Sequence, residues 1–98
     1  MLEVRFASRS LERRYTQGQE AIRAWGPQVG RRYVQRVGVL LEALDVSELH
    51  GYRALGFHPL RGNRRGQHAL RLTGQMRLIV TVIDERTVRV EEVTDYHE

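Results

Sequence analysis

The chain has 98 residues and a formal net charge of +4, and all sixteen of its basic residues are arginine. This length predicts a single domain over residues 1–98, and the positive charge suits an anionic partner. The absence of cysteine excludes disulfides, a thiolate nucleophile and a thiolate metal site. No apolar run approaches the ~20 residues of a membrane span and the first residues do not resemble a signal peptide, so we expect no membrane partner and a cytoplasmic location.

The first part of the chain predicts a strand and then a helix. Apolar residues alternate with charged ones over residues 2–6, which is typical of a short strand with one buried face. Ser8 or Ser10 can cap a helix in which apolar residues recur at spacings of three and four as far as Trp25. Gly26 and Pro27 then predict the end of this helix and the start of another.

A second helix is indicated by a second apolar stripe. The stripe consists of Val29, Tyr33, Val37, Leu40, Leu41 and Leu44. This assignment directs Arg31, Arg32 and Arg36 toward solvent. The two helices are therefore expected to form a helical hairpin.

The second half of the chain predicts a long loop and a sheet. Residues 45–66 show no periodicity and are rich in glycine, and loops of that length tend to be functional or mobile. Alternating apolar residues return over residues 68–72, 76–82 and 88–90, separated by turns at 73–75 and 84–86. The expected fold is α+β, with a three-stranded antiparallel meander forming one sheet with the first strand.

The register of the first hairpin brings two arginines together. If Leu70 faces Leu78 on the buried side, Arg71 lies directly opposite Arg77 on the other face. Like charges in this position are destabilising, and an anion between them would relieve the repulsion. An equally weighted alternative is that both extend into water or pair with Glu91 or Asp95.

The last strand leaves one assignment open. Glu91 and Glu92 interrupt its alternation, which indicates a bulge. We call the face of the sheet that carries Arg71 and Arg77 the arginine face. Because side chains alternate between faces, either Tyr96 or His97 shares it. The pattern does not decide between them.

Residues suited to proton transfer lie near these arginines in sequence. His58 and His97 can exchange protons near neutral pH, whereas the guanidiniums in the loop HPLRGNRRG can only stabilise charge. No HExxH, P-loop or GxSxG motif occurs, and no histidine pair has the spacing of a helical metal site, which disfavours a metal. We interpret His50 as a surface histidine. The basic loop could equally be a solvated turn.

The order of these features resembles the HigB branch of the RelE/ParE toxin superfamily, over essentially the whole chain. The matching pieces are HPLRG at residues 58–62, the basic cluster and glycine at residues 64–66, Arg71 with Arg77, and the sequence Asp-Tyr-His at residues 95–97. The resemblance implies a RelE/ParE-like fold and a toxin that is neutralised by a helix-turn-helix antitoxin of HigA type. Many members cleave mRNA in the A site of the small ribosomal subunit.

The resemblance also implies a metal-free and cofactor-free endoribonuclease in which the ribose 2′-OH attacks the adjacent phosphate. It assigns phosphate binding to Arg61, Arg71 and Arg77, and proton transfer to His58 with Tyr96 or His97, the acid and base roles being interchangeable. The substrate-binding residues expected around them are Arg64, Arg65, His68 and Asp95. Many relatives carry lysine where Arg61 stands, and arginine is a poor proton donor.

Two other functions remain open at this point. One is a non-catalytic toxin of ParE type, which binds DNA gyrase through its helical hairpin. The other is an antitoxin-binding domain without toxicity. The terminal Asp-Tyr-His sequence and His58 favour the nuclease, since a protein that only binds has no need of proton donors there.

Overall fold

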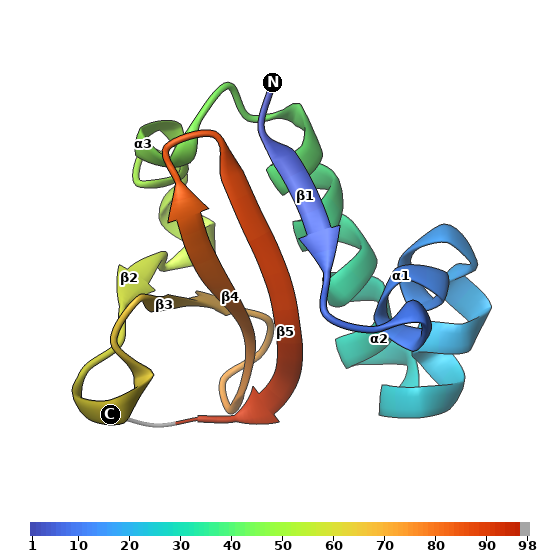
Figure 1. Cartoon of the computed structure of the whole chain (residues 1–98). Coiled ribbons are helices and arrows are strands. Elements are labelled where there is room, and N and C mark those ends of the chain that lie inside the picture. The colour runs from blue at the N-terminus through green and yellow to red at the C-terminus, as the bar shows by residue number, and fades with distance from the viewer. Residues whose placement is uncertain (97–98) are drawn as a thin grey trace.

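A five-stranded sheet forms the framework of the protein in the computed structural model, which describes residues 1–96. The strands are β1 (Glu3–Phe6), β2 (His58–Pro59), β3 (Gln67–Arg71), β4 (Met76–Asp84) and β5 (Thr87–Asp95). Their spatial order is β1-β5-β4-β3-β2, with β1 parallel to β5 and the other pairs antiparallel. Figure 1 shows β1 and β2 at opposite edges of this sheet. The predicted α+β class is confirmed.

The helices are α1 (Arg9–Thr16) and α2 (Gly18–Glu42), followed by the short α3 (Val46–Leu49) and two 3₁₀ turns, η1 (Arg53–Leu55) and η2 (Gly62–Arg64). In Figure 1, α1 and α2 lie toward the right, beside β1, whereas α3 lies at the upper left, near the turn between β4 and β5. Ser8 caps α1 by accepting a hydrogen bond from the Leu11 amide, as the sequence predicts. No helix in residues 1–96 is long and apolar enough to cross a membrane.

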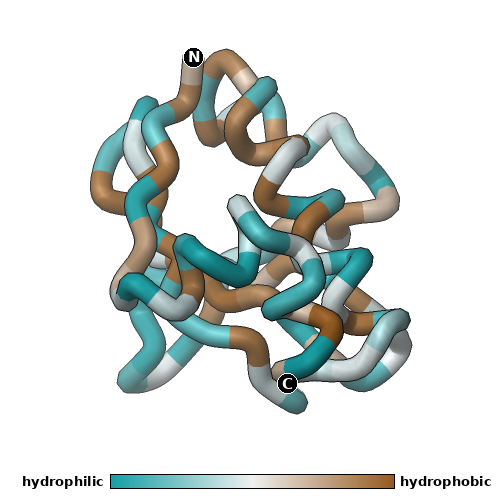
Figure 2. Tube along the Cα trace, turned by 90° about the vertical axis from the view of Figure 1, so that its right-hand side faces the viewer, coloured by the Kyte–Doolittle hydropathy of each residue, from teal (hydrophilic) through white to brown (hydrophobic). Residues whose placement is uncertain are grey.

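The core lies between α2 and one face of the sheet. Fully buried members of this cluster are Tyr33, Val37 and Leu40 of α2 with Leu70, Leu78, Val80, Val88 and Val90 of the strands. In Figure 2 hydrophobic and hydrophilic residues alternate along the chain, as expected where each element buries one side. The opposite face of β3, β4 and β5 is turned away from α2.

The helical hairpin differs in detail from the prediction. The first predicted helix is broken at Gln17, whose φ of −125° and ψ of 84° lie outside the helical region and which precedes the poor helix former Gly18. The predicted boundary at Gly26 and Pro27 is confirmed, because Gly26 has a φ of 85° and bends α2 there. We call residues 18–25 the first arm and residues 27–42 the second arm.

The predicted positions of two residues are wrong: one was assigned to the apolar stripe and the other to the solvent side of the second helix. Leu44 lies beyond the end of α2 and is 62% exposed. Arg36 was expected in solvent but is only 5% exposed. The physical reason is its spacing, since positions three, four and seven residues after Tyr33 share one helix face. Arg36 therefore enters the interior beside Val37.

The region predicted as a long loop, residues 45–66, contains short regular elements. Asp45 caps α3 by accepting a hydrogen bond from the Glu48 amide. Further along, His58 and Pro59 pair with β3 and so add a fifth strand that the sequence pattern did not reveal. A two-residue strand shows no alternation, and it includes a proline, which sheets tolerate at their edges.

Candidate active site

Three of the predicted site residues share the face of the sheet that is turned away from α2. The predicted register is confirmed, because Arg71 of β3 pairs directly with Arg77 of β4. His58 of β2 pairs with Ala69, two residues before Arg71 and therefore on the same face. Diagonal neighbours in a sheet lie about 7–8 Å apart, so His58 and the arginine pair are close enough to contact one phosphodiester group.

A β-bulge decides which terminal residue joins this face. The pairing shifts between Ile79, which faces Glu92, and Val80, which faces Val90, so Glu91 is the extra residue on β5. The bulge lets Glu91 and Glu92 both point away from the core, and alternation then places Tyr96 on that same side. The ring of Tyr96 packs against Leu60, Ala69 and Ile79. His97 lies outside the described residues.

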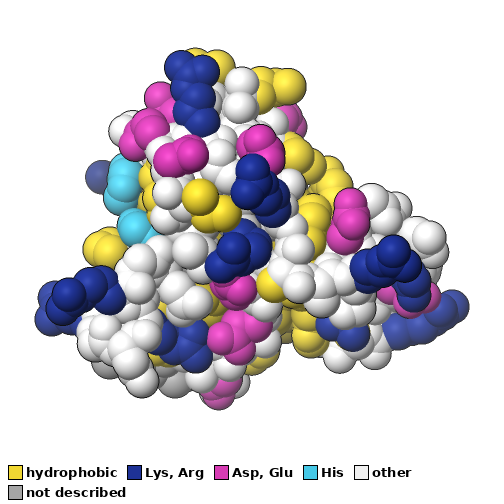
Figure 3. All heavy atoms as spheres, in the orientation of Figure 1, with side chains coloured by type: hydrophobic (Ala, Val, Ile, Leu, Met, Phe, Trp, Pro, Cys, Tyr) yellow, Lys and Arg dark blue, Asp and Glu magenta, His cyan; other side chains and the backbone are white. Residues whose placement is uncertain are grey.

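The arginines on this face divide into two groups. Arg5 pairs with Glu3 at 2.7 Å and Arg89 with Glu91 at 2.7 Å. Within residues 1–96, neither Arg71 nor Arg77 forms an ion pair with a carboxylate. The alternative in which this pair is neutralised by Glu91 is therefore wrong. Figure 3 shows basic and acidic side chains interleaved over this side of the molecule.

The side chains of the arginine pair have different supports. The Nη1 group of Arg77 donates to the backbone carbonyls of Thr73 at 2.7 Å and Met76 at 3.0 Å, which anchors it at the turn between β3 and β4. Arg71 is exposed, and its guanidinium lies beside Gly56, where a Cβ would come within 3.5 Å of the Arg71 Cζ. Gly56 has a φ of 55°, a conformation that favours glycine. Arg71 is thus the arginine more available to a ligand.

His58 has a defined ring orientation. Its Nδ1 lies 2.8 Å from the carbonyl oxygen of Gly56. A carbonyl can only accept a hydrogen bond, so Nδ1 carries the proton and donates. Proton exchange with a substrate then falls to Nε2.

The loop between β2 and β3 reaches the end of β5 through Arg64. Its guanidinium bonds Glu92 at 3.0 Å and Gln67 at 3.1 Å, and lies 5.4 Å from the centroid of the Tyr96 ring. This ion pair and the ring contact hold the loop to the last part of β5 and to Tyr96. Arg61 and Arg65 of the same loop are exposed, and neither makes a side-chain hydrogen bond within the described part of the chain.

The structure does not bring His68 to the arginine face. His68 pairs with Val80, whose side chain belongs to the core, and its ring stacks on Phe57 at a centroid distance of 4.5 Å. Burial, and after it the neighbouring His50 and His58, lower the pKa of His68. Asp95, opposite Met76, is exposed and lies one residue before Tyr96. Among residues 1–96, no three His, Asp or Glu side chains are arranged to hold a metal ion.

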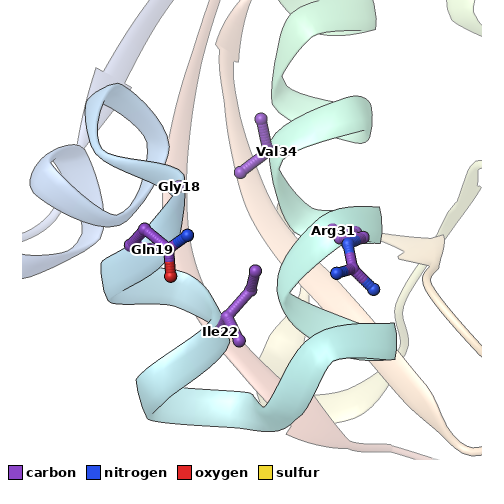
Figure 4. Close-up of a pocket in the computed structure, with 5 residues that line it drawn as sticks. All are labelled: Gly18, Gln19, Ile22, Arg31 and Val34. Carbon is purple, nitrogen blue, oxygen red and sulfur yellow. The ribbon is translucent and has the colours of Figure 1, made fainter.

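A separate hollow lies between the two arms of α2. It has a volume of about 300 Å³ and is lined by Gly18, Gln19, Ile22, Arg31 and Val34. Figure 4 shows Ile22 on the first arm, with Val34 and Arg31 on the second arm. The helical hairpin therefore presents apolar side chains next to a positive charge.

Comparisons with known proteins identify the fold. No protein-family model matches the chain, and no curated protein matches its sequence. Among solved structures, YafQ from E. coli strain BL21(DE3) matches with a TM-score of 0.60 and 10% identity, over 97% of this chain and 93% of that chain. A YoeB/ParE toxin from Agrobacterium tumefaciens matches with a TM-score of 0.57 and 16% identity, over 98% and 100%.

A chain of the YoeB-YefM complex from Staphylococcus aureus matches with a TM-score of 0.54 and 20% identity, over 100% of this chain and 99% of that chain. Identities this low establish the fold alone. The chain therefore has the same fold as YafQ, the YoeB/ParE toxin and YoeB.

Proposed function

We propose that the protein is the toxin of a bacterial type II toxin-antitoxin pair, of HigB type, and a ribosome-dependent endoribonuclease. The toxin fold and the order of sequence motifs support this proposal. The observation that carries it is the sheet face that holds His58, Tyr96 and the pair Arg71 and Arg77. Proton-transfer groups beside guanidiniums that lack carboxylate partners within residues 1–96 suit cleavage of a phosphodiester.

The proposed reaction is a transesterification within the RNA. The ribose 2′-oxygen forms a bond to phosphorus while the bond from phosphorus to the 5′-oxygen breaks, giving a 2′,3′-cyclic phosphate and a 5′-hydroxyl. One residue takes the proton of the 2′-OH and another donates a proton to the leaving oxygen. His58 through Nε2 and either Tyr96 or His97 fill these two roles, in one order or the other.

Negative charge develops on the nonbridging oxygens during this reaction, and preorganised guanidiniums stabilise it. Arg71 and Arg77 are proposed to hold these oxygens, with Arg61 approaching from the loop. Arg64, with its contact to the Tyr96 ring, is proposed to set the position of that phenol. Arg65 and Asp95 are exposed at the rim and are proposed to contact neighbouring nucleotides.

The test compares the wild-type protein with variants in which one side chain is replaced. Induction of the wild-type chain without an antitoxin should arrest translation and leave cuts within translated mRNA, mapped by primer extension. Arg71→Ala should slow single-turnover cleavage of ribosome-bound mRNA by about 10²–10³-fold, the usual effect of losing one charge-stabilising donor. His58→Gln, which keeps polar volume but does not titrate, should slow cleavage by about 10²–10⁴-fold with little change in ribosome binding.

Arg86→Ala is the matched control for these variants. Arg86 is an exposed arginine in the turn between β4 and β5, at the other end of β4 from Arg77, and its loss should leave cleavage unchanged. Growth arrest with intact mRNA and inhibited gyrase would replace the nuclease by a toxin of ParE type. Full activity in His58→Gln would remove that histidine from the mechanism.

The proposed partner is a small helix-turn-helix antitoxin of HigA type, and mRNA on the ribosome is the proposed substrate. One of the matching structures is a complex of YoeB with YefM. The hollow between the arms of α2 lies on the helices rather than on the arginine face. An antitoxin bound there would contact the toxin at least partly away from the arginine face.

A further inference from the structure

Arg36 is a buried charge without a carboxylate partner in residues 1–96. Its guanidinium instead donates to three neutral oxygens: the Arg71 carbonyl at 2.9 Å, the Gln35 Oε1 at 3.2 Å and the Ala54 carbonyl at 3.3 Å. Burial, and after it the charges of Arg32 and Arg71, lower the pKa of Arg36. Arginine remains charged despite this, so the site keeps an uncompensated positive charge.

Two of the three contacts, those to Arg71 and Ala54, join elements that are far apart in the sequence. Arg36 lies on the second arm of α2, Arg71 ends β3 and Ala54 belongs to η1. Through two backbone carbonyls, one planar guanidinium therefore fixes the end of β3 against the segment that leads to Gly56. Arginine suits this task because its donors have a rigid geometry.

The same segment positions both proposed functional groups. The Arg71 guanidinium lies beside Gly56, and the Gly56 carbonyl accepts the hydrogen bond from His58 Nδ1 at 2.8 Å. A displacement of residues 54–56 would thus move the Arg71 side chain and the His58 ring together. Arg36 is the buried group that holds this segment to β3.

We propose that Arg36 is a positioning residue for the phosphate site. It fixes Arg71 and His58 relative to each other. Its buried charge, together with the exposed charges of Arg71 and Arg32, makes the site electropositive until an anion binds. The ligand class is a phosphate or phosphodiester anion, which contacts Arg71 and not Arg36. This inference rests on the proposed function for its catalytic consequence but not for its binding consequence.

Inorganic phosphate is the probe for the binding consequence. Titration of the free protein with phosphate should shift the NMR signals of the Arg71 side-chain Nε–H and the His58 ring. Arg36→Met keeps an unbranched apolar stem but removes the charge and the donors, and should weaken phosphate binding at least tenfold. Arg36→Lys keeps a charge but not the planar fork, so it should recover part of the affinity while the His58 signals stay displaced.

Arg86→Met removes the same unit of charge from a remote exposed turn and should behave as wild type in both measurements. In single-turnover cleavage of ribosome-bound mRNA, Arg36→Met should lower the maximal rate at least tenfold and alter its pH profile, with a smaller change in KM. Circular dichroism and thermal unfolding show whether each variant folds. If Arg36→Met does not fold, the results for Arg36→Lys decide whether Arg36 has the positioning role.

The outcomes separate the two proposals. If folded Arg36→Met binds phosphate and cleaves RNA like the wild type, the positioning role is wrong and the proposed function stands. If the wild type binds phosphate in an Arg36-dependent manner but leaves mRNA intact, the nuclease is wrong and the anion site stands. If the wild type cleaves RNA but binds no phosphate, an unchanged pH profile and rate in Arg36→Met overturn the positioning role.

Discussion

His68 is the histidine whose charge is most clearly controlled by its surroundings. Its Nδ1 is buried without a hydrogen-bond partner in the described structure, and its ring lies near those of Phe57 and His50. Burial and the neighbouring His50 and His58 lower the pKa of His68. His68 therefore binds a proton less readily in the folded protein than in the unfolded chain, where it accepts one below about pH 6.5. The contribution of His68 to stability is therefore complete above that pH and is lost as the pH falls toward the lower, folded-state pKa.

Unfolding by urea at pH 7.5, 6.5 and 5.5 checks this direction. The wild type should lose stability on acidification more steeply than His68→Phe, which keeps a ring to stack on Phe57 but cannot titrate. Comparison within this pair cancels the contribution of groups common to both proteins. Equal slopes would show that another group, and not His68, controls the response.

Single residues were predictable where alternation decides their position. The pairing of Arg71 with Arg77 follows from keeping Leu70 and Leu78 on the buried face, and the structure confirms it. The burial of Arg36 does not follow from its charge, because its helical spacing from Tyr33 decides which way the side chain points. The link from Gly56 to His58 and Arg71 depends on a left-handed backbone conformation that a loop sequence does not reveal.

Among the elements, the two arms of α2 approach each other closely at Gly30. A Cβ on Gly30 would lie 2.7 Å from the Ile22 amide nitrogen and 2.8 Å from the Ala21 carbonyl carbon, and backbone atoms cannot move aside cheaply. Gly30→Ala should therefore lower the free energy of unfolding by about 1–3 kcal/mol, the usual effect of overpacking. Gly38→Ala is the matched control in the same arm.

A Cβ on Gly38 would meet no atom within 4 Å, so replacing that helical glycine by alanine should raise stability by about 0.5–1 kcal/mol. Denaturant unfolding followed by circular dichroism measures both variants. The free energy of unfolding should fall in Gly30→Ala and rise in Gly38→Ala. A rise in both variants would show that helix propensity outweighs the contact between the arms.

Longer elements were more predictable than short ones. The strand pattern over residues 68–90 and the bulge near Glu91 are confirmed because several side chains report each face. The break at Gln17 and the two-residue β2 were not predicted, since one poor helix former and two residues are too short a signal for a periodic pattern to show. β2 matters for the site, because its pairing with Ala69 puts His58 on the arginine face.

At the scale of the whole molecule, positive charge is concentrated on the helices. Residues 9–42, which span α1 and α2, hold seven arginines and three glutamates, a net charge of +4, whereas the rest of the chain holds nine arginines and nine carboxylates, a net charge of zero. In Figure 3 basic side chains lie over the helical lobe at the right. The basic character of the protein therefore belongs mainly to the hairpin, and the arginine face is a local feature within a balanced sheet.

This asymmetry predicts the chemistry of the antitoxin. A partner segment that carries acidic residues around one apolar side chain would match the Ile22 and Val34 hollow and the surrounding arginines. Ile22→Glu places a negative charge in that hollow and should weaken the complex with the helix-turn-helix protein of the adjacent reading frame at least tenfold. Ile83→Glu, at an exposed apolar position on β4, is the control and should bind normally.

Calorimetric titration at two salt concentrations completes this test. The affinity of the wild type for the antitoxin should fall as the salt concentration rises, because salt screens the attraction between exposed charges, with a Debye length of about 8–10 Å near physiological ionic strength. Cleavage of ribosome-bound mRNA by free Ile22→Glu should match the wild type, since the hollow lies apart from the arginine face. If Ile22→Glu and Ile83→Glu bind the antitoxin with equal affinity and without salt dependence, the antitoxin does not bind at the hairpin. The positive charge of the hairpin would then serve another anionic partner.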